Sequence, residues 1–268
     1  MLELPQVTLC CVDTRTPQLA LAALARCTAG IRFAEVLLFT DTRVCRQAPP
    51  GVRLVDMRIE SVAAYSEFML RGITPHIATS HWLIVQWDGF VLDASAWRPE
   101  FLDHDYIGAP WPKVEGERAV GNGGFSLRSR RLLQALQDPE IVVSHPEDVC
   151  ICQLNRDHLE QQHGIRFAPL ALARHFAYER AKPNHPTFGV HGLFNFADVF
   201  SPEELLQLLR GLPDEMCRGL DAHDLAEELL RRGELDAAAV IIDKRKRLGM
   251  TDRRSWRLRL KHRLARWR

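Results

Sequence analysis

Four short segments of this 268-residue sequence place chemically active side chains beside a glycine, a proline or a turn. In the first, residues 85–89 are Val-Gln-Trp-Asp-Gly, so Asp88 follows an apolar run and precedes a glycine. A carboxylate in such a turn can hold a divalent cation, and the glycine lets the backbone approach a ligand. An Asp-Gly pair is also a common plain turn, which is the simpler interpretation of this segment taken alone.

The second segment is rich in glycine: Gly121, Asn122, Gly123 and Gly124 precede Phe-Ser-Leu-Arg-Ser. Three glycines in four positions cost chain entropy on folding, so they are expected where backbone lies against a sugar or phosphate, or adopts a positive φ. A flexible loop or an Asn-Gly hairpin is the alternative. The apolar Phe-x-Leu that follows indicates that the loop enters a strand, which favours an ordered site.

Acidic residues mark the third segment, and a histidine between glycines marks the fourth. Ser144, with Glu147 three residues later, predicts a capping box, and proline suits a first helical turn. Glu147 would then be only a cap, whereas Asp148 is left to act as a general base. His191, in Gly-Val-His-Gly, is able to ligate a metal or touch a phosphate, although a lone histidine is more often structural or solvated.

Alternating strands and helices must position these segments. Apolar runs at 7–12, 34–40, 51–56 and 81–85 predict strands, and residues 18–29 and 61–71 predict helices between them. This order predicts an α/β fold with a mostly parallel sheet. Ligands bind beyond the carboxyl ends of such strands, where Asp13, Asp41 and Asp88 fall.

Taken together in this order, the four segments resemble the signature elements of GT-A-type glycosyltransferases. Those enzymes join a Rossmann-like nucleotide-binding half and an acceptor-binding half in one fold. Their Asp-x-Asp motif corresponds to Gln86-Trp87-Asp88, their glycine-rich loop to residues 121–124, their x-Glu-Asp motif to residues 146–148 and their C-terminal histidine to His191. The strings IVQWDGF, DYIGAPW, GNGGFSLRS, EDV and FGVHG also look like a family of bacterial and fungal domains of unknown function related to these transferases, over residues 7–195.

The resemblance implies transfer of a sugar from a nucleotide-sugar donor to an acceptor hydroxyl, with inversion, in the synthesis of a surface polysaccharide, lipopolysaccharide or glycolipid. Asp148 would be the base in preference to Glu147, and Asp88 and His191 would hold Mn²⁺ or Mg²⁺. The first Asp of Asp-x-Asp is replaced by Gln86, which cannot neutralise a cation, so metal dependence is open. The residues expected to contact the donor sugar and the acceptor are Gln86, Trp87, Trp111 and residues 121–124. Those expected to contact the nucleotide are Asp13, Thr14 and Asp41.

Charge is distributed unevenly along the chain. Residues 243–268 contain twelve Lys and Arg against Asp243 and Asp252, a net charge of +10, which leaves −9 for the rest of a chain whose total is +1. On a helical wheel the tail forms an apolar face, flanked by basic residues, that consists of Trp256, Leu260, Leu264 and Trp267. A helix of this kind suits an anionic membrane surface. A solvated tail is the plain alternative, and nucleic-acid binding is less favoured.

We expect three parts: a GT-A-like domain at 1–200, a helical extension at 201–250 and the basic amphipathic tail at 251–268. No signal peptide or spanning segment is recognisable, and the seven cysteines lack paired zinc-type spacing. These features predict a cytoplasmic protein, peripheral on the inner leaflet through its tail. Two other functions stay open: a non-catalytic nucleotide- or glycan-binding module of the same fold, and a membrane or nucleic-acid adaptor built around the tail.

Overall fold

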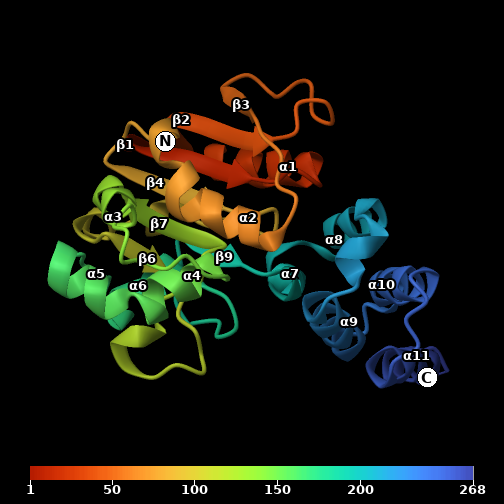
Figure 1. The fold of residues 1–268 in the computed structure, drawn as a ribbon. Helices are drawn as coiled ribbons and strands as arrows, with labels where there is room; N and C mark the ends of the chain where they lie inside the picture. Colours follow the sequence, from red (N-terminus) through yellow and green to blue (C-terminus); the bar gives the residue numbers. More distant parts are fainter. Residues whose placement is uncertain (268) are drawn as a thin grey trace. The chain divides into compact units, whose positions relative to one another are not determined.

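The computed structural model describes residues 1–267 and divides into two compact units, Met1–His191 and Gly192–Arg268. The first unit is built on a six-stranded sheet with the order β3-β2-β1-β4-β7-β6 (Figure 1). Its strands are β1 (Leu2–Val12), β2 (Ile31–Thr40), β3 (Val52–Asp56), β4 (His81–Val85), β6 (Tyr106–Gly108) and β7 (Phe125–Ser129).

The first four strands of this sheet are parallel, and β7 lies antiparallel between β4 and β6. The predicted α/β class with a mostly parallel sheet and a helical C-terminal region is therefore confirmed. Strands β1, β2 and β4 are apolar runs whose residues are largely buried, as expected for a sheet covered on both faces, whereas the edge strand β3 has no fully buried residue.

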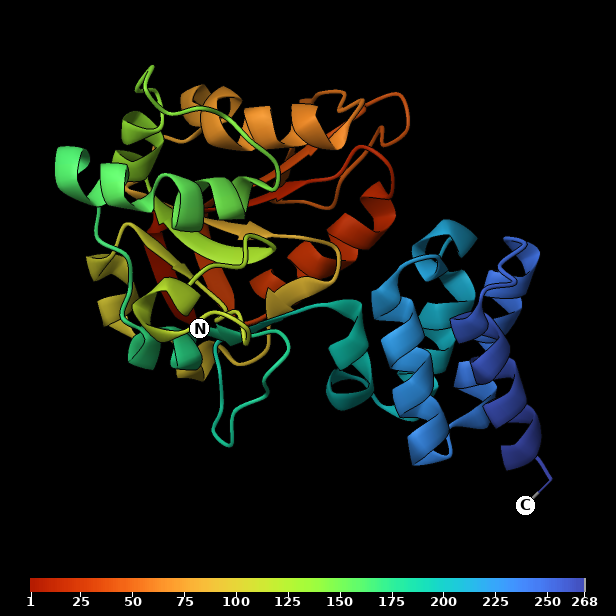
Figure 2. The same cartoon turned by 60° about the horizontal axis from the view of Figure 1, so that its bottom comes forward.

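Helices cover both faces because the chain winds in two directions from β1 (Figure 2). Helix α1 (Pro17–Thr28) connects β1 to β2, whereas α2 (Val62–Glu67) lies in the crossover from β3 back to β4. Right-handed crossovers in opposite directions place these helices on opposite faces. A π-helical turn, Phe68–Gly72, continues α2 and packs on the sheet through a buried cluster that includes Phe39, Met69 and Trp82.

A second, three-stranded sheet with the order β5-β9-β8 brings the C-terminal histidine of this unit to the end of β4. It consists of β5 (Gly89–Val91), β9 (Gly189–His191) and β8 (Ala177–Tyr178). Strand β5 begins just after the turn at Gln86–Asp88, and its first residue, Gly89, pairs with His191. The pairing of β5 with β9 thus brings together residues about a hundred positions apart in the sequence.

The second unit is a helical array. It contains α7 (Phe196–Val199), α8 (Pro202–Gly211), α9 (Leu220–Arg232), α10 (Leu235–Arg247) and α11 (Arg253–Ala265). A capping box formed by Ser201 and Glu204 starts α8, and Gly233, with φ of 78°, ends α9. Helices α8, α9 and α10 account for the helical C-terminal region that the sequence predicts.

Part of the basic run is buried inside this unit, which the sequence did not indicate. Lys244 donates to the carbonyl of Leu212, and Arg245 donates to the carbonyls of Cys217 and Gly219. Both cations complete the ends of neighbouring turns, whereas Lys246 and Arg247 of the same helix are exposed. Within residues 1–267, no helix is both long enough and apolar enough to cross a membrane.

Candidate functional site

A cavity of about 1070 Å³ lies beyond the carboxyl ends of β1 and β4. It contains residues from all four chemically active segments, which the fold therefore brings together. The residues singled out in the sequence that line it are Asp13, Thr14, Gln86, Trp111, Asn122, Gly123, Gly124, Glu147, Asp148 and His191. Trp87, Asp88, Gly121 and Asp41 are not among its lining residues.

His191 stands between two carboxylates, one on each ring nitrogen. Its Nε2 atom lies 3.5 Å from Asp88 Oδ1 and 3.2 Å from Gln86 Oε1. Its Nδ1 atom lies 3.3 Å from Glu179 Oε1. Asp88 itself is 7% exposed and meets the histidine without lining the cavity.

This environment favours the protonated imidazole. Burial alone lowers the pKa of His191, but the adjacent Asp88 and Glu179 carboxylates outweigh it and raise that pKa to about 10. At neutral pH both ring nitrogens then carry a proton, and each donates toward one carboxylate. A cation at Nε2 has to displace one of these protons.

The donor atoms around Nε2 suit a divalent cation. Asp88 offers a carboxylate oxygen, Gln86 an amide oxygen and His191 an imidazole nitrogen. Glu179, on the opposite ring nitrogen, has the position of the outer carboxylate that orients a metal-bound histidine. In addition, the buried Asn122 Oδ1 has no hydrogen-bond partner, while its Nδ2 lies 3.2 Å from His191 Nδ1. Mixed oxygen and nitrogen ligation of this kind fits Mn²⁺.

The glycine-rich loop is held close to the functional side chains, and this explains its composition. A Cβ at Gly121 would overlap the Trp111 ring, one at Gly123 would overlap Glu147 Oε1, and one at Gly124 would overlap His191 Nε2. None of these glycines has a positive φ; the residue that does is Asn122, at 29°. Close approach is therefore the reason for the glycines, and the predicted entry into a strand is confirmed by β7.

Asp148 is fixed against this loop with its carboxylate at the cavity. Its Oδ2 atom accepts a hydrogen bond of 2.9 Å from the Gly123 N–H, and its Oδ1 atom accepts one from the Val149 N–H. The side chain is half-buried, so it can meet both the loop and a ligand. Asp148 lies in α4 (Glu147–Val149), a single turn whose backbone continues into the π-helical segment Cys150–Leu154.

The predicted capping box at Ser144 and Glu147 is wrong. The helix begins at Glu147, its N-terminal flanking residue is Pro146, and no side chain caps it. The Ser144 hydroxyl is buried without a hydrogen-bond partner. Glu147 instead forms an ion pair of 3.1 Å with Arg128, whose side chain is fully buried. A carboxylate that compensates a buried guanidinium has a structural role, because its loss would leave the Arg128 charge buried without a partner carboxylate.

The three strand-end residues differ in their placement. Asp13 accepts hydrogen bonds from the backbone N–H groups of Arg15 and Thr16, which orders the start of α1, and Thr14 lies beside it at the cavity. Asp41 is turned away into ion pairs with Arg43 and Arg58. The Arg43 hydrogen bond lowers the pKa of Asp41 far below its usual range, which agrees with a structural role in its loop.

Two functional residues could not be found by sequence motifs. Glu179 reaches His191 only because β8 pairs in parallel with β9, and nothing at positions 177–179 resembles a motif. Arg128 belongs to the glycine-loop segment, yet its role depends on full burial between the rings of Trp82 and Tyr106. One of its terminal nitrogens, Nη1, is buried without a partner.

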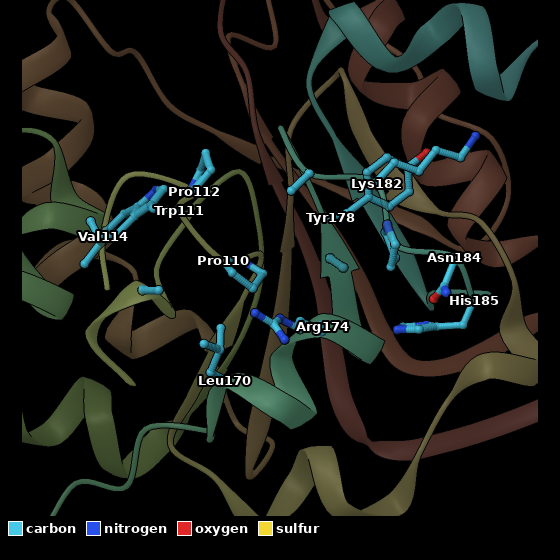
Figure 3. Close-up of a pocket in the computed structure, with 14 residues that line it drawn as sticks. Pro110, Trp111, Pro112, Val114, Leu170, Arg174, Tyr178, Lys182, Asn184 and His185 are labelled. Carbon is cyan, nitrogen blue, oxygen red and sulfur yellow. The ribbon is translucent and has the colours of Figure 1, made fainter. Parts of the chain in front are cut away.

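A second pocket, of about 440 Å³, shares Trp111 with the first cavity (Figure 3). Figure 3 shows Arg174, from α6 (Leu170–Phe176), between Pro110 and His185, with Tyr178 and Lys182 above it in this view. Its described lining residues include no Asp or Glu. The pocket therefore offers a positively charged surface next to the main cavity.

Comparison with protein-family models gives a match over residues 52–191, to the family described as "Protein of unknown function (DUF5672)". The chain belongs to this family. No curated protein matches.

Among solved structures, the chain is similar to one titled as an active-site mutant of LgtC. The identity is 14% and the TM-score 0.42, over 69% of this chain and 86% of that chain. A TM-score this low does not establish a common fold. Membership of DUF5672 names no activity, so the function has to be inferred from the cavity itself.

Proposed function

We propose that this DUF5672 member is an inverting, nucleotide-sugar-dependent glycosyltransferase with a GT-A-like catalytic domain. The observation that carries the proposal is that two consecutive glycines contact the two reactive groups. Gly123 donates its N–H to Asp148, and Gly124 lies against His191 Nε2. A base and a candidate metal ligand thus face one cavity of about 1070 Å³, which is large enough for a nucleotide sugar.

In this proposal Asp148 removes the proton of the acceptor hydroxyl. The hydroxyl oxygen forms a bond to the anomeric carbon of the donor sugar from the face opposite the diphosphate. The bond from that carbon to the diphosphate oxygen breaks, and the nucleoside diphosphate leaves with the electron pair. The hydrogen bonds from Gly123 and Val149 hold the carboxylate in one orientation while it accepts the proton.

Asp88, His191 and Gln86 are the residues that would hold Mn²⁺ or Mg²⁺. The cation would offset the charge that grows on the leaving diphosphate. Since Gln86 is neutral, Asp88 is the one carboxylate facing Nε2, and Glu179 supplies a second negative charge through the imidazole ring. We therefore expect a metal site that is weaker than one with two direct aspartates.

We assign the donor to the main cavity, where Asp13, Thr14, Gln86, Trp111 and residues 122–124 line the wall. We assign the acceptor to the neighbouring pocket behind Trp111. Because the Arg174 guanidinium lines that pocket, an acceptor bearing phosphate or carboxylate groups suits it. Acidic glycans and phosphate-linked lipid carriers of surface polysaccharide or lipopolysaccharide are such acceptors.

Release of the donor's nucleotide tests this proposal: a nucleoside diphosphate from UDP- and GDP-sugars, and CMP from CMP-sugars. The purified chain is incubated with UDP-, GDP- and CMP-sugars, with and without Mn²⁺. We expect turnover with one donor class, loss of turnover in Asp148→Asn and Asp88→Asn, and no change in Asp103→Asn, an exposed carboxylate outside the cavity. Nucleotide binding with no turnover in the wild type would favour the non-catalytic binding module.

We also propose that α11 holds the protein at an anionic membrane surface. The helix packs on its own unit through Ser255 and Leu258, which are buried. The predicted apolar face points elsewhere and is exposed, with exposed fractions of 56% for Trp256, 39% for Leu260, 59% for Leu264 and 87% for Trp267. An exposed stripe of this size on a helix marks an interaction surface.

The charges beside the stripe favour a lipid surface as the occupant. Arg253, Arg257 and Arg263 are exposed next to it, and each basic residue near anionic lipid contributes about 1 kcal/mol. Sedimentation with vesicles containing anionic lipid tests this. We expect binding that is lost in Trp256→Ala/Leu260→Ala and retained in Leu220→Ala, an exposed leucine on another helix. Equal binding by both variants, or binding to DNA in place of vesicles, would contradict the proposal.

A further inference from the structure

A cluster of metal-binding side chains lies outside the main cavity, between the end of α3 (Arg130–Ala135) and α5 (Arg156–His163). Asp138, in the loop after α3, faces His158 and His163 of α5. Among the described residues, these three form the one group whose ligand atoms all lie within 4.8 Å of one another.

The geometry converges on one oxygen atom. Asp138 Oδ2 lies 2.9 Å from His158 Nε2 and 2.7 Å from His163 Nε2. Its other oxygen, Oδ1, accepts the N–H of Glu140, which fixes the carboxylate so that Oδ2 points at both rings.

The surroundings of this cluster resemble those of a metal-binding site, and its three side chains are accessible to solvent. Glu140 Oε2 lies 3.9 Å from His158 Nδ1, the ring nitrogen opposite the cluster, where an outer carboxylate orients a metal-bound imidazole. The side chains of Asp138, His158 and His163 are 18%, 26% and 28% exposed, so an ion can reach them from solvent.

We propose that Asp138, His158 and His163 form a binding site for a transition-metal dication, with Zn²⁺ as the best fit. Two imidazole nitrogens and one carboxylate oxygen are a ligand set that zinc favours, whereas Mg²⁺ and Ca²⁺ require oxygen ligands. Zinc would displace the two Nε2 protons to Nδ1 or to solvent, and water would supply the fourth ligand. The ion joins the loop after α3 to α5, the helix that follows the segment carrying Asp148.

Zinc titration of the EDTA-treated full chain tests this site separately from the cavity, because His191 provides a second place for a cation. The variants are His158→Gln, His163→Gln and His191→Gln, with His104→Gln as a control for histidine loss at a site without a metal cluster. Glutamine keeps a donor toward Asp138, so the fold is preserved, which circular dichroism checks. Calorimetry measures stoichiometry and affinity, and thermal unfolding measures the gain in Tm with Zn²⁺.

We expect wild type, His191→Gln and His104→Gln to share one zinc site and a zinc-dependent rise in Tm. Removing either cluster histidine should weaken that site by more than about tenfold and, in the His191→Gln background, abolish the rise in Tm, while nucleotide-sugar turnover in the wild-type background stays unchanged. Equal zinc affinity in wild type and His163→Gln would overturn the proposal. So would the absence of zinc binding in the wild type, or an equal effect of Mg²⁺ on the Tm of His191→Gln.

Discussion

His191 should make the stability of the metal-free protein fall between pH 7 and pH 9. Burial lowers the pKa of this histidine, but the Asp88 and Glu179 carboxylates raise it from its ordinary value of 6.5 to about 10. A histidine whose pKa is higher in the folded state stabilises that state fully below the unfolded value, and the contribution disappears as the pH passes the folded value. The contribution should therefore be present at pH 6 and lost by pH 10 and above.

The magnitude follows from the two pKa values. One pKa unit corresponds to about 1.4 kcal/mol, and across two pH units inside this window the histidine loses about 2–3 kcal/mol of stabilisation. Buried cysteines act in the same direction, because burial raises the pKa of Cys27 to about 12 and that of Cys217 to about 11. His191→Gln keeps these thiols, so the difference between wild type and variant isolates the histidine.

Urea unfolding of EDTA-treated protein at pH 7 and pH 9 measures this difference. Trp256→Phe and Trp267→Phe should be introduced in both proteins, because the four remaining tryptophans then all lie in the first unit. The free energy of unfolding of the wild-type background should fall by about 2–3 kcal/mol more than that of His191→Gln. An equal fall in both proteins would show that His191 is not held between two carboxylates, and the metal site derived from that geometry would be lost with it.

Three further predictions concern the cavity and its neighbour. Gly124→Ala should remove turnover and Mn²⁺ binding while the chain still folds, because the new methyl group overlaps His191 Nε2; activity and metal titration check this. Glu147→Gln should destabilise the protein by about 3–5 kcal/mol, since it leaves the buried Arg128 charge uncompensated; urea unfolding measures it, and a loss under 1 kcal/mol would contradict the buried ion pair. Arg174→Glu should raise the KM for an acidic acceptor about tenfold or more, with the KM for the donor unchanged; initial rates at varied acceptor decide, and equal effects on both constants would remove the acceptor from the second pocket.

Much of the fold could be predicted from the sequence because the strands are continuous apolar runs and the polar residues come at their ends. Asp13 and Gln86 reach the cavity for this reason. Asp41 also follows a strand, but it does not line the cavity, because its carboxylate forms ion pairs with Arg43 and Arg58. Strand-end position alone could not separate it from the residues that do. The position of a residue after a strand predicts that it lies at this edge of the sheet. The ion pairs and hydrogen bonds of its side chain then determine whether it faces the cavity.

Other parts depended on contacts between distant residues. The spacing of Ser144 and Glu147 predicted a cap, but the fully buried Arg128 takes up the Glu147 carboxylate instead. Glu179 joins His191 through the register of β8 and β9, which carries no local sequence signal. The glycines of the loop were expected to make room for a ligand or a positive φ, whereas they make room for Trp111, Glu147 and His191.

The assignment of Asp148 as the base is tested most directly by transfer and binding measured on the same variant. Asp148→Asn keeps the size of the side chain and an oxygen that accepts the Gly123 N–H, but it cannot take a proton. With the donor class that the wild type uses, we expect kcat to fall by about 10²–10⁴-fold while the Kd for the nucleotide sugar stays within a factor of about three. Transfer by Asp148→Asn at the wild-type rate would contradict the proposed mechanism.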